Sequence, residues 1–239
     1  VESEVFIMVK YVADSSCDLF SMDHVDFASV PLLLYTDKDQ FLDDGTIDIE
    51  HFLTTIENHK GRSYTSCPGT EAWLDAFEGG DEIYVLTITS GLSGTYNSAV
   101  IAKDLYLEKH PDAKIHVFDT LSTGPEMRMA LEKLIALKEE GKPFEEVIPL
   151  TQKYLDDTHL LFVLGSIRNL AQNGRVNKIL ASAVGVLGIN IVGVATIDGI
   201  IEQVAKCRGI KQIVSSLLKN FQKLNYNGGK VYITHVQNE

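Results

Sequence analysis

The sequence predicts an α/β protein made of two α/β domains, and three observations support that class. In the first two thirds of the chain, short apolar runs alternate with amphipathic stretches, which predicts a Rossmann-like parallel sheet with helices on both faces. After residue 156 the pattern changes, because Asp198-Gly199 joins two apolar runs as a hairpin turn does. The chain has 239 residues, 45% of them hydrophobic, which is enough to bury a core without disulfides or metals. We therefore expect an N-terminal parallel-sheet domain over residues 1–156 and a C-terminal mixed-sheet domain over residues 157–239.

Local signals predict the elements of the N-terminal domain. Apolar runs of strand length predict strands over residues 5–13, 30–35, 83–88 and 115–118. Helical periodicity predicts helices over residues 49–58, 95–108, 125–140 and 144–155, and a further helix that opens at Pro68-Gly69-Thr70. Residues 61–65 are predicted to form a loop or a short strand.

The C-terminal domain is predicted to contain a strand over residues 160–164, the Asp198-Gly199 hairpin, a helix over 209–224 and a last strand over 231–235. Residues 179–197 carry no charge, but their glycines and β-branched second half predict a short helix and a buried strand rather than a membrane-spanning helix. Nothing follows the last strand to cover it, so we expect this domain to be truncated at the C-terminus.

Charge and cysteine content exclude several classes of protein. Acidic residues outnumber basic ones 33 to 21, and a formal charge of −12 argues against nucleic acid as the main partner. The three cysteines (Cys17, Cys67 and Cys207) form no C-x-x-C pair, so neither a zinc site nor a disulfide framework is expected. Together with the absence of a signal peptide, this favours a reducing, cytoplasmic location.

The sequence lacks the G-x-G-x-x-G and G-x-x-x-x-G-K phosphate loops and any metal-binding histidine pattern, so we expect no cofactor and no metal. Instead, hydroxyl-bearing residues follow several predicted strands. They occur at Asp14-Ser15-Ser16, Thr65-Ser66, residues 90–95 and Asp119-Thr120. Loops after parallel strands meet at one sheet edge, and short polar residues at helix N-termini suit an anion. Because these loops contain no lysine or arginine, a carboxylate fits better than a polyphosphate; the alternative is that these residues only cap helices.

Taken together, these motifs make the sequence similar to the DegV family of bacterial fatty-acid-binding proteins, which includes the FakB subunits of fatty acid kinase. The matching segments run in order along the chain: residues 12–19 (VADSSCDL), 30–32 (VPL), 65–68 (TSCP), 89–99 (TSGLSGTYNSA), 119–120 (DT), 173–175 (NGR), 198–199 (DG) and 206–209 (KCRG). The sequence departs from the family pattern at Cys67, where glutamine is usual, and at Asn173, which replaces the first glycine of a G-G-R motif.

The resemblance implies a long-chain fatty acid, such as palmitate or oleate, enclosed between the two domains. It implies that the hydroxyls of Thr65 and Ser93 bind the carboxylate, that Ser66 and Gly94 support them, and that Arg175 lies near the mouth of the site. It also implies a carrier without catalytic activity, which presents the fatty acid to an ATP-dependent fatty acid kinase subunit. The resulting acyl phosphate would feed phospholipid synthesis.

Two other functions remain open. One is a small α/β acyl hydrolase with Ser93 as nucleophile, although Gly91-Leu92-Ser93-Gly94 does not have the G-x-S-x-G spacing of a nucleophile elbow. The other is a lipid-sensing interaction module, in which a bound lipid changes the affinity for a partner.

Overall fold

The centre of the molecule is a parallel sheet, seen in a computed structural model that describes residues 7–59, 61–176 and 188–236. Its strands are β1 (Val9–Asp14), β2 (Phe27–Val30), β6 (Glu82–Thr87) and β7 (Lys114–Asp119). They lie in the order β2-β1-β6-β7, and every neighbouring pair is parallel. After β1 the chain adds β2 on one side and later adds β6 and β7 on the other. The switch point of the sheet, where ligands of such folds bind, therefore lies between the carboxyl ends of β1 and β6.

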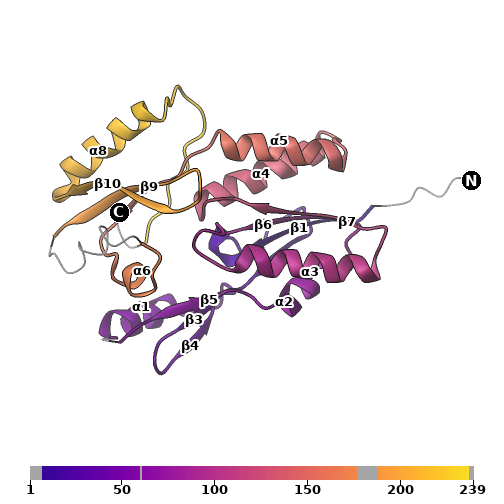
Figure 1. Cartoon of the computed structure of the whole chain (residues 1–239), viewed down its shortest axis with the longest axis horizontal. Helices are drawn as coiled ribbons and strands as arrows, with labels where there is room; N and C mark the ends of the chain where they lie inside the picture. Colours follow the sequence, from indigo (N-terminus) through magenta and orange to yellow (C-terminus); the bar gives the residue numbers. More distant parts are fainter. Residues whose placement is uncertain (1–6, 60, 177–187, 237–239) are drawn as a thin grey trace, which may run out of the picture.

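Helices cover both faces of this sheet, as predicted. The helices are α2 (Thr70–Phe77) and α3 (Thr95–Lys109) on one face, and α4 (Pro125–Glu139) and α5 (Phe144–Asp156) on the other (Figure 1). Alternate strand residues face the two layers: Val12 and Val85 pack in the cluster with Trp73, whereas Tyr84 packs in the cluster with Leu131. The parallel sheet is thus buried on both faces, which explains the continuous apolar runs of its strands.

A separate, small antiparallel sheet is formed by the part of the chain between β2 and β6. It contains β3 (Leu33–Tyr35), β4 (Gln40–Leu42) and β5 (Tyr64–Ser66) in the order β4-β3-β5, and it is accompanied by α1 (Ile49–Asn58). The prediction of one strand over residues 30–35 is wrong, because the chain leaves the parallel sheet at Pro31. Proline has no N–H for the ladder, and the next amide, of Leu32, donates to Ser15 Oγ at 3.1 Å. The strand β5 of this sheet carries Thr65, one of the predicted site residues.

The C-terminal part of the molecule, residues 161–236, which we call the second half, has its own sheet. It consists of β8 (Leu161–Leu164), β9 (Asn190–Ala195) and β10 (Ile201–Cys207) in the order β10-β9-β8. The predicted Asp198-Gly199 hairpin is confirmed, since β9 and β10 pair antiparallel. In Figure 1, α8 (Gly209–Lys223) covers one side of this sheet and the short α6 (Arg168–Gln172) lies on the other.

Two expectations for this half require correction. Its described strands are antiparallel throughout, not mixed, and residues 231–235 do not form the expected strand. In this segment Tyr232 contacts α4: its hydroxyl donates to Glu132 Oε1 at 2.9 Å and its ring lies under the Arg128 guanidinium. The short helix expected after residue 179 falls largely on residues 177–187, outside the described residues.

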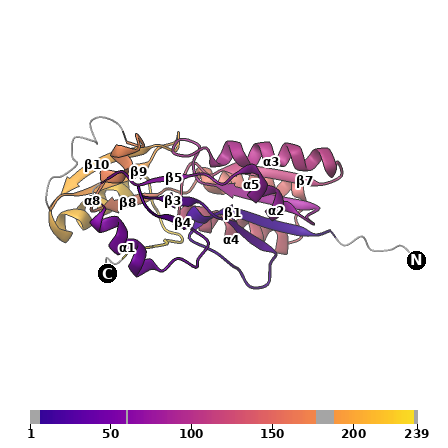
Figure 2. The ribbon, with the colours of Figure 1, turned by 90° about the horizontal axis from the view of Figure 1, so that it is seen from below.

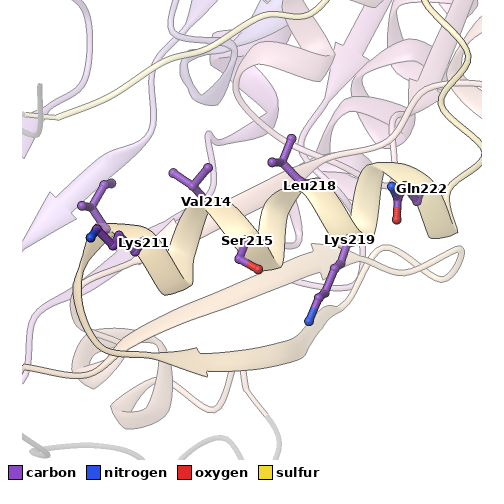
Figure 3. Close-up of a pocket in the computed structure, with 7 residues that line it drawn as sticks. Lys211, Val214, Ser215, Leu218, Lys219 and Gln222 are labelled. Carbon is purple, nitrogen blue, oxygen red and sulfur yellow. The ribbon is translucent and has the colours of Figure 1, made fainter.

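The outer side of α8 carries an open groove (Figure 3). Val214 and Leu218 project from the same side of the helix and are exposed, as is Ile210 at its start. Within the described part of the chain, no helix is both long enough and apolar enough to cross a membrane.

Candidate functional site

The loops that follow β1 and β6 are tied together by Asp14. This carboxylate caps the short 3-10 helix Ser15–Cys17 by accepting from the Ser16 amide at 3.0 Å, and it accepts from the Ile88 amide at 2.6 Å. The side chain is fully buried, and burial raises the pKa of Asp14 to about 6. In this loop Asp14 acts as a cap, because both of its carboxylate oxygens accept hydrogen bonds from backbone amides inside the protein.

The loop after β7 is built in the same way. Asp119 Oδ1 accepts from the amides of Ser90 and Leu121, at 3.0 and 3.2 Å, and the Thr120 hydroxyl donates to the Thr87 carbonyl at 2.8 Å. Asp14 and Asp119 therefore hold the residues 88–90 from two sides. Their polar atoms shape the sheet edge, and Ser93 lies three residues beyond this support.

Ser93 stands at the start of α3 with its hydroxyl half-buried. Its Oγ lies 2.7 Å from Thr95 Oγ1 and accepts from the Thr95 amide at 3.3 Å. The N-cap residue of α3 is Gly94, which has no side chain to satisfy the first amides of this 15-residue helix. Uncapped amides at the positive end of a helix attract an anion, and Ser93 lies next to them.

Thr65 lies on β5, paired with Leu34 of β3, and it is exposed. Among the described residues, its hydroxyl has no hydrogen-bond partner. The chain just after it lies beside the Ser93 loop: a Cβ placed on Gly94 would be 3.5 Å from Cys67 Sγ, and the Ser98 hydroxyl donates to the Pro68 carbonyl at 2.8 Å. The structure thus brings together the segments that carry four predicted site residues: Thr65, Ser66, Ser93 and Gly94.

Arg175 also reaches this place, from the turn that ends α6. Its Nε donates to the Leu92 carbonyl at 3.1 Å and its Nη1 to the Asn173 carbonyl at 2.6 Å. The guanidinium is half-buried and spends two of its donor groups on backbone carbonyls. Arg175 therefore holds the loop before Ser93.

Sequence reasoning missed Thr89. This buried hydroxyl donates to the Gly199 carbonyl at 2.8 Å and accepts from the Gly91 amide at 3.1 Å. Gly199 has a φ of +68°, and a Cβ there would lie 2.0 Å from Thr89 Oγ1, so only glycine fits. The glycine of the hairpin was visible in the sequence, but its contact with a loop 110 residues away was not.

The described residues contain no group of three histidine, cysteine or acidic side chains that could hold a metal ion. The site consists instead of hydroxyls, backbone amides and one helix N-terminus, gathered near the switch point of a parallel sheet and touched by a turn and a hairpin from a second sheet. The fold and site are those of a two-part α/β protein with an edge suited to an anionic group.

The chain belongs to the DegV family. A model of the family described as "Uncharacterised protein, DegV family COG1307" matches residues 8–239. A DegV domain-containing protein of Streptococcus pyogenes serotype M1 is 42% identical over 233 residues, which cover 96% of this chain and 83% of that protein.

Two solved structures share the fold. One is a DegV family protein from Eubacterium eligens loaded with heptadecanoic acid, with a TM-score of 0.90 and 50% identity over 93% of this chain and 80% of that chain. The other is the Streptococcus pneumoniae Fatty Acid Kinase (Fak) B3 protein loaded with linoleic acid, with a TM-score of 0.89 and 40% identity over the same shares of the two chains. The predicted family and the α/β fold class are therefore confirmed.

Proposed function

We propose that this protein binds a long-chain fatty acid and presents its carboxylate to a separate ATP-dependent kinase subunit in the cytoplasm, without catalysing a step itself. The acyl phosphate formed would then enter phospholipid synthesis. The observation that carries this proposal is the meeting of the Thr65 segment with the Ser93 loop at the uncapped N-terminus of α3.

The head group is matched by neutral donors. A carboxylate can accept from hydroxyls and from helix N-terminal amides, and both are present beside Gly94. The proposal is supported by the ligands of the two solved relatives, heptadecanoic and linoleic acid, which carry this head group. We assign Thr65 and Ser93 to direct contact, and Ser66, Gly94 and Arg175 to support.

The tail supplies most of the affinity in this proposal. Burying a methylene contributes about 0.8 kcal/mol, so a long chain contributes on the order of 10 kcal/mol before the costs of association. Apolar side chains of β3 and β8 are only half-buried in this structure, and we assign them to the wall around the tail. The head group then mainly sets orientation.

Neutral donors have a chemical advantage for a carrier. They hold the carboxylate by hydrogen bonds, while Arg175 uses its Nε and Nη1 to bind backbone carbonyls. The oxygens keep their charge and their nucleophilic character toward a phosphoryl donor. We assign the ATP site to a partner, since the sequence lacks the common phosphate loops.

The first test is native mass spectrometry of the purified protein, followed by solvent extraction of any ligand. We expect a stoichiometric adduct with the mass of a long-chain fatty acid, which would also reveal its length and saturation. A mass equal to that of the bare chain, unchanged after incubation with oleate or palmitate, would contradict the proposal.

The second test separates the head group from the tail. In the double variant Thr65→Val/Ser93→Ala, we expect fatty acid to be retained while acyl phosphate formation by the kinase subunit of Streptococcus pneumoniae falls at least tenfold. The control is Thr54→Val/Ser215→Ala, which removes two exposed hydroxyls on α1 and α8. Equal losses of binding and phosphorylation would contradict this division of labour.

The hydrolase alternative has a weaker basis, because the Ser93 hydroxyl pairs with Thr95, which is no general base. Hydrolysis of a chromogenic ester that is lost in Ser93→Ala would revive it.

A further inference from the structure

The side chain of Asn173 joins the second half of the molecule to the segment before Thr65. Its Nδ2 donates to the Ser63 carbonyl at 2.7 Å and to the Asn169 carbonyl at 2.8 Å. Its Oδ1 accepts from Arg62 Nε at 2.9 Å. The two bonds from Nδ2 need a carboxamide and the third needs a side-chain oxygen, so a glycine at this position could make none of them.

The backbone of the turn explains why Asn173 and Arg175 point to one place. The helix α6 ends in a Schellman motif, in which the Arg175 amide donates to the Leu170 carbonyl and the Gly174 amide to the Ala171 carbonyl. Gly174 takes the left-handed conformation that this motif requires, with a φ of +68°. The motif fixes the directions of the side chains on either side of the glycine.

The two side chains hold different segments. Asn173 binds Ser63, two residues before Thr65, whereas Arg175 binds Leu92, one residue before Ser93. One turn from the second half of the chain therefore hydrogen-bonds to both hydroxyl-bearing segments, just before Thr65 and just before Ser93. The bond to Ser63 depends on Asn173.

We propose that Asn173 is a positioning residue: its carboxamide and the Arg175 guanidinium form a clasp that keeps Thr65 and Ser93 in register, and the clasp must open before a fatty acid can leave. This rests on the proposed function, since it names the step that limits exchange of that ligand. The bonds cross between the two halves of the molecule, so any separation of the halves at this edge breaks them. A net contribution of about 0.5–1.5 kcal/mol per hydrogen bond corresponds to a factor of about 2–12 in the rate of opening.

The test compares Asn173→Ala with the control Asn169→Ala, an exposed asparagine one turn earlier on α6. The protein is loaded with oleate, and its replacement by deuterated oleate is followed by native mass spectrometry. We expect exchange to be about tenfold faster in Asn173→Ala, with saturating occupancy unchanged, and unchanged in Asn169→Ala. An exchange rate in Asn173→Ala equal to that of the control would overturn the proposal.

Two further variants test the atoms involved. Asn173→Asp keeps an acceptor for Arg62 but turns an oxygen toward the Ser63 and Asn169 carbonyls, so we expect exchange as fast as in Asn173→Ala or faster. Arg62→Ala should speed exchange in the native background and add nothing in Asn173→Ala. Fully additive effects would mean that Arg62 acts elsewhere and would overturn its place in the clasp.

A second readout needs no ligand. We expect amide hydrogen exchange to accelerate in peptides spanning residues 61–67 in Asn173→Ala, and in those spanning 89–95 in Arg175→Ala, relative to Asn169→Ala. If the wild type holds no fatty acid at all, the proposed function fails, and this readout alone decides whether the clasp exists. Unchanged protection of both segments would overturn it.

Discussion

The loops that follow β1 and β6 differ in how their polar side chains are bonded. Both are rich in serine, and both lie at the switch point of the parallel sheet. After β1, Asp14 and Ser15 are buried and their oxygens accept from backbone amides. After β6, Ser93 is half-buried and bonded only to a neighbouring threonine, at the end of a helix that has no side-chain cap.

This difference indicates which polar side chains remain available to bind a ligand. A polar side chain that satisfies buried amides is consumed by the fold, so it has nothing left for a ligand. A polar side chain whose partners are local and solvent-accessible is free to exchange them. The β1 loop is the support and the β6 loop is the candidate ligand contact, and the following four experiments probe that division in order of decreasing effect.

Asp14→Ala should have the largest effect. It leaves the amides of Ser16 and Ile88 without their acceptor, so we expect the free energy of unfolding to fall by about 4 kcal/mol. Urea denaturation at neutral pH measures the loss. Asp14→Asn retains one acceptor oxygen and should lose less; a loss below about 1 kcal/mol in Asp14→Ala would show that the loop is not held by this side chain.

The pH dependence of stability should show the burial of the same carboxyl. Because its pKa is raised from 3.8 to about 6, the folded protein keeps a proton there that the unfolded chain has released. Its contribution to stability is therefore present at low pH and is lost as pH rises through about 6.

We expect the difference in unfolding free energy between wild type and Asp14→Asn to fall by about 2 kcal/mol from about pH 4 to about pH 7. Other carboxyls titrate in both proteins and cancel in the difference. A flat difference across this range would contradict the raised pKa.

Thr89→Val should have an intermediate effect. The change keeps the shape but removes the donor to the Gly199 carbonyl and the acceptor for the Gly91 amide. We expect a loss of about 1.5 kcal/mol in unfolding free energy, and Thr89→Ser should recover most of it. Unchanged stability in Thr89→Val would contradict the role of the hydroxyl, and failure of serine to recover stability would mean that the methyl group contributes as well.

Thr65→Val should have the smallest effect on stability, within about 0.5 kcal/mol, because the residue is exposed and its hydroxyl is unbonded among the described residues. Thermal unfolding of the ligand-free protein is the measurement. A loss above about 2 kcal/mol would place Thr65 with the supporting residues and blur the contrast between the two kinds of hydroxyl.

The helices of the parallel-sheet layer and the strands β1, β6 and β7 could be predicted because each carries its own signal, whereas β2 was missed. Buried strands are continuous apolar runs; α3 begins at Thr95, α4 begins at Pro125, and Pro143 is the N-cap of α5. The split at Pro31 and the polar strand β4 could not be predicted, because both depend on where the neighbouring strand lies. Residues 231–235 show the converse: their strand-like sequence forms no strand, and the Tyr232 side chain contacts α4.

The candidate site could be predicted only in part. The hydroxyl-rich loops were visible, but pattern alone did not separate Asp14, which is consumed by capping, from Ser93, which is not. The pairing of Thr65 with Ser93 came from the family resemblance. The contacts of Thr89 with Gly199 and of Asn173 with Ser63 join residues about 110 positions apart, and no local signal encodes such a contact.

The three cysteines give the protein a chemical reporter. Cys17 and Cys207 are buried, and burial raises the pKa of the Cys17 thiol to about 12, whereas Cys67 is half-buried beside Gly94. A small alkylating reagent should therefore mark Cys67 first. Because Cys67 lies two residues from Thr65, its labelling rate should change when a ligand occupies the candidate site. The native thiol would then report occupancy without an engineered tag.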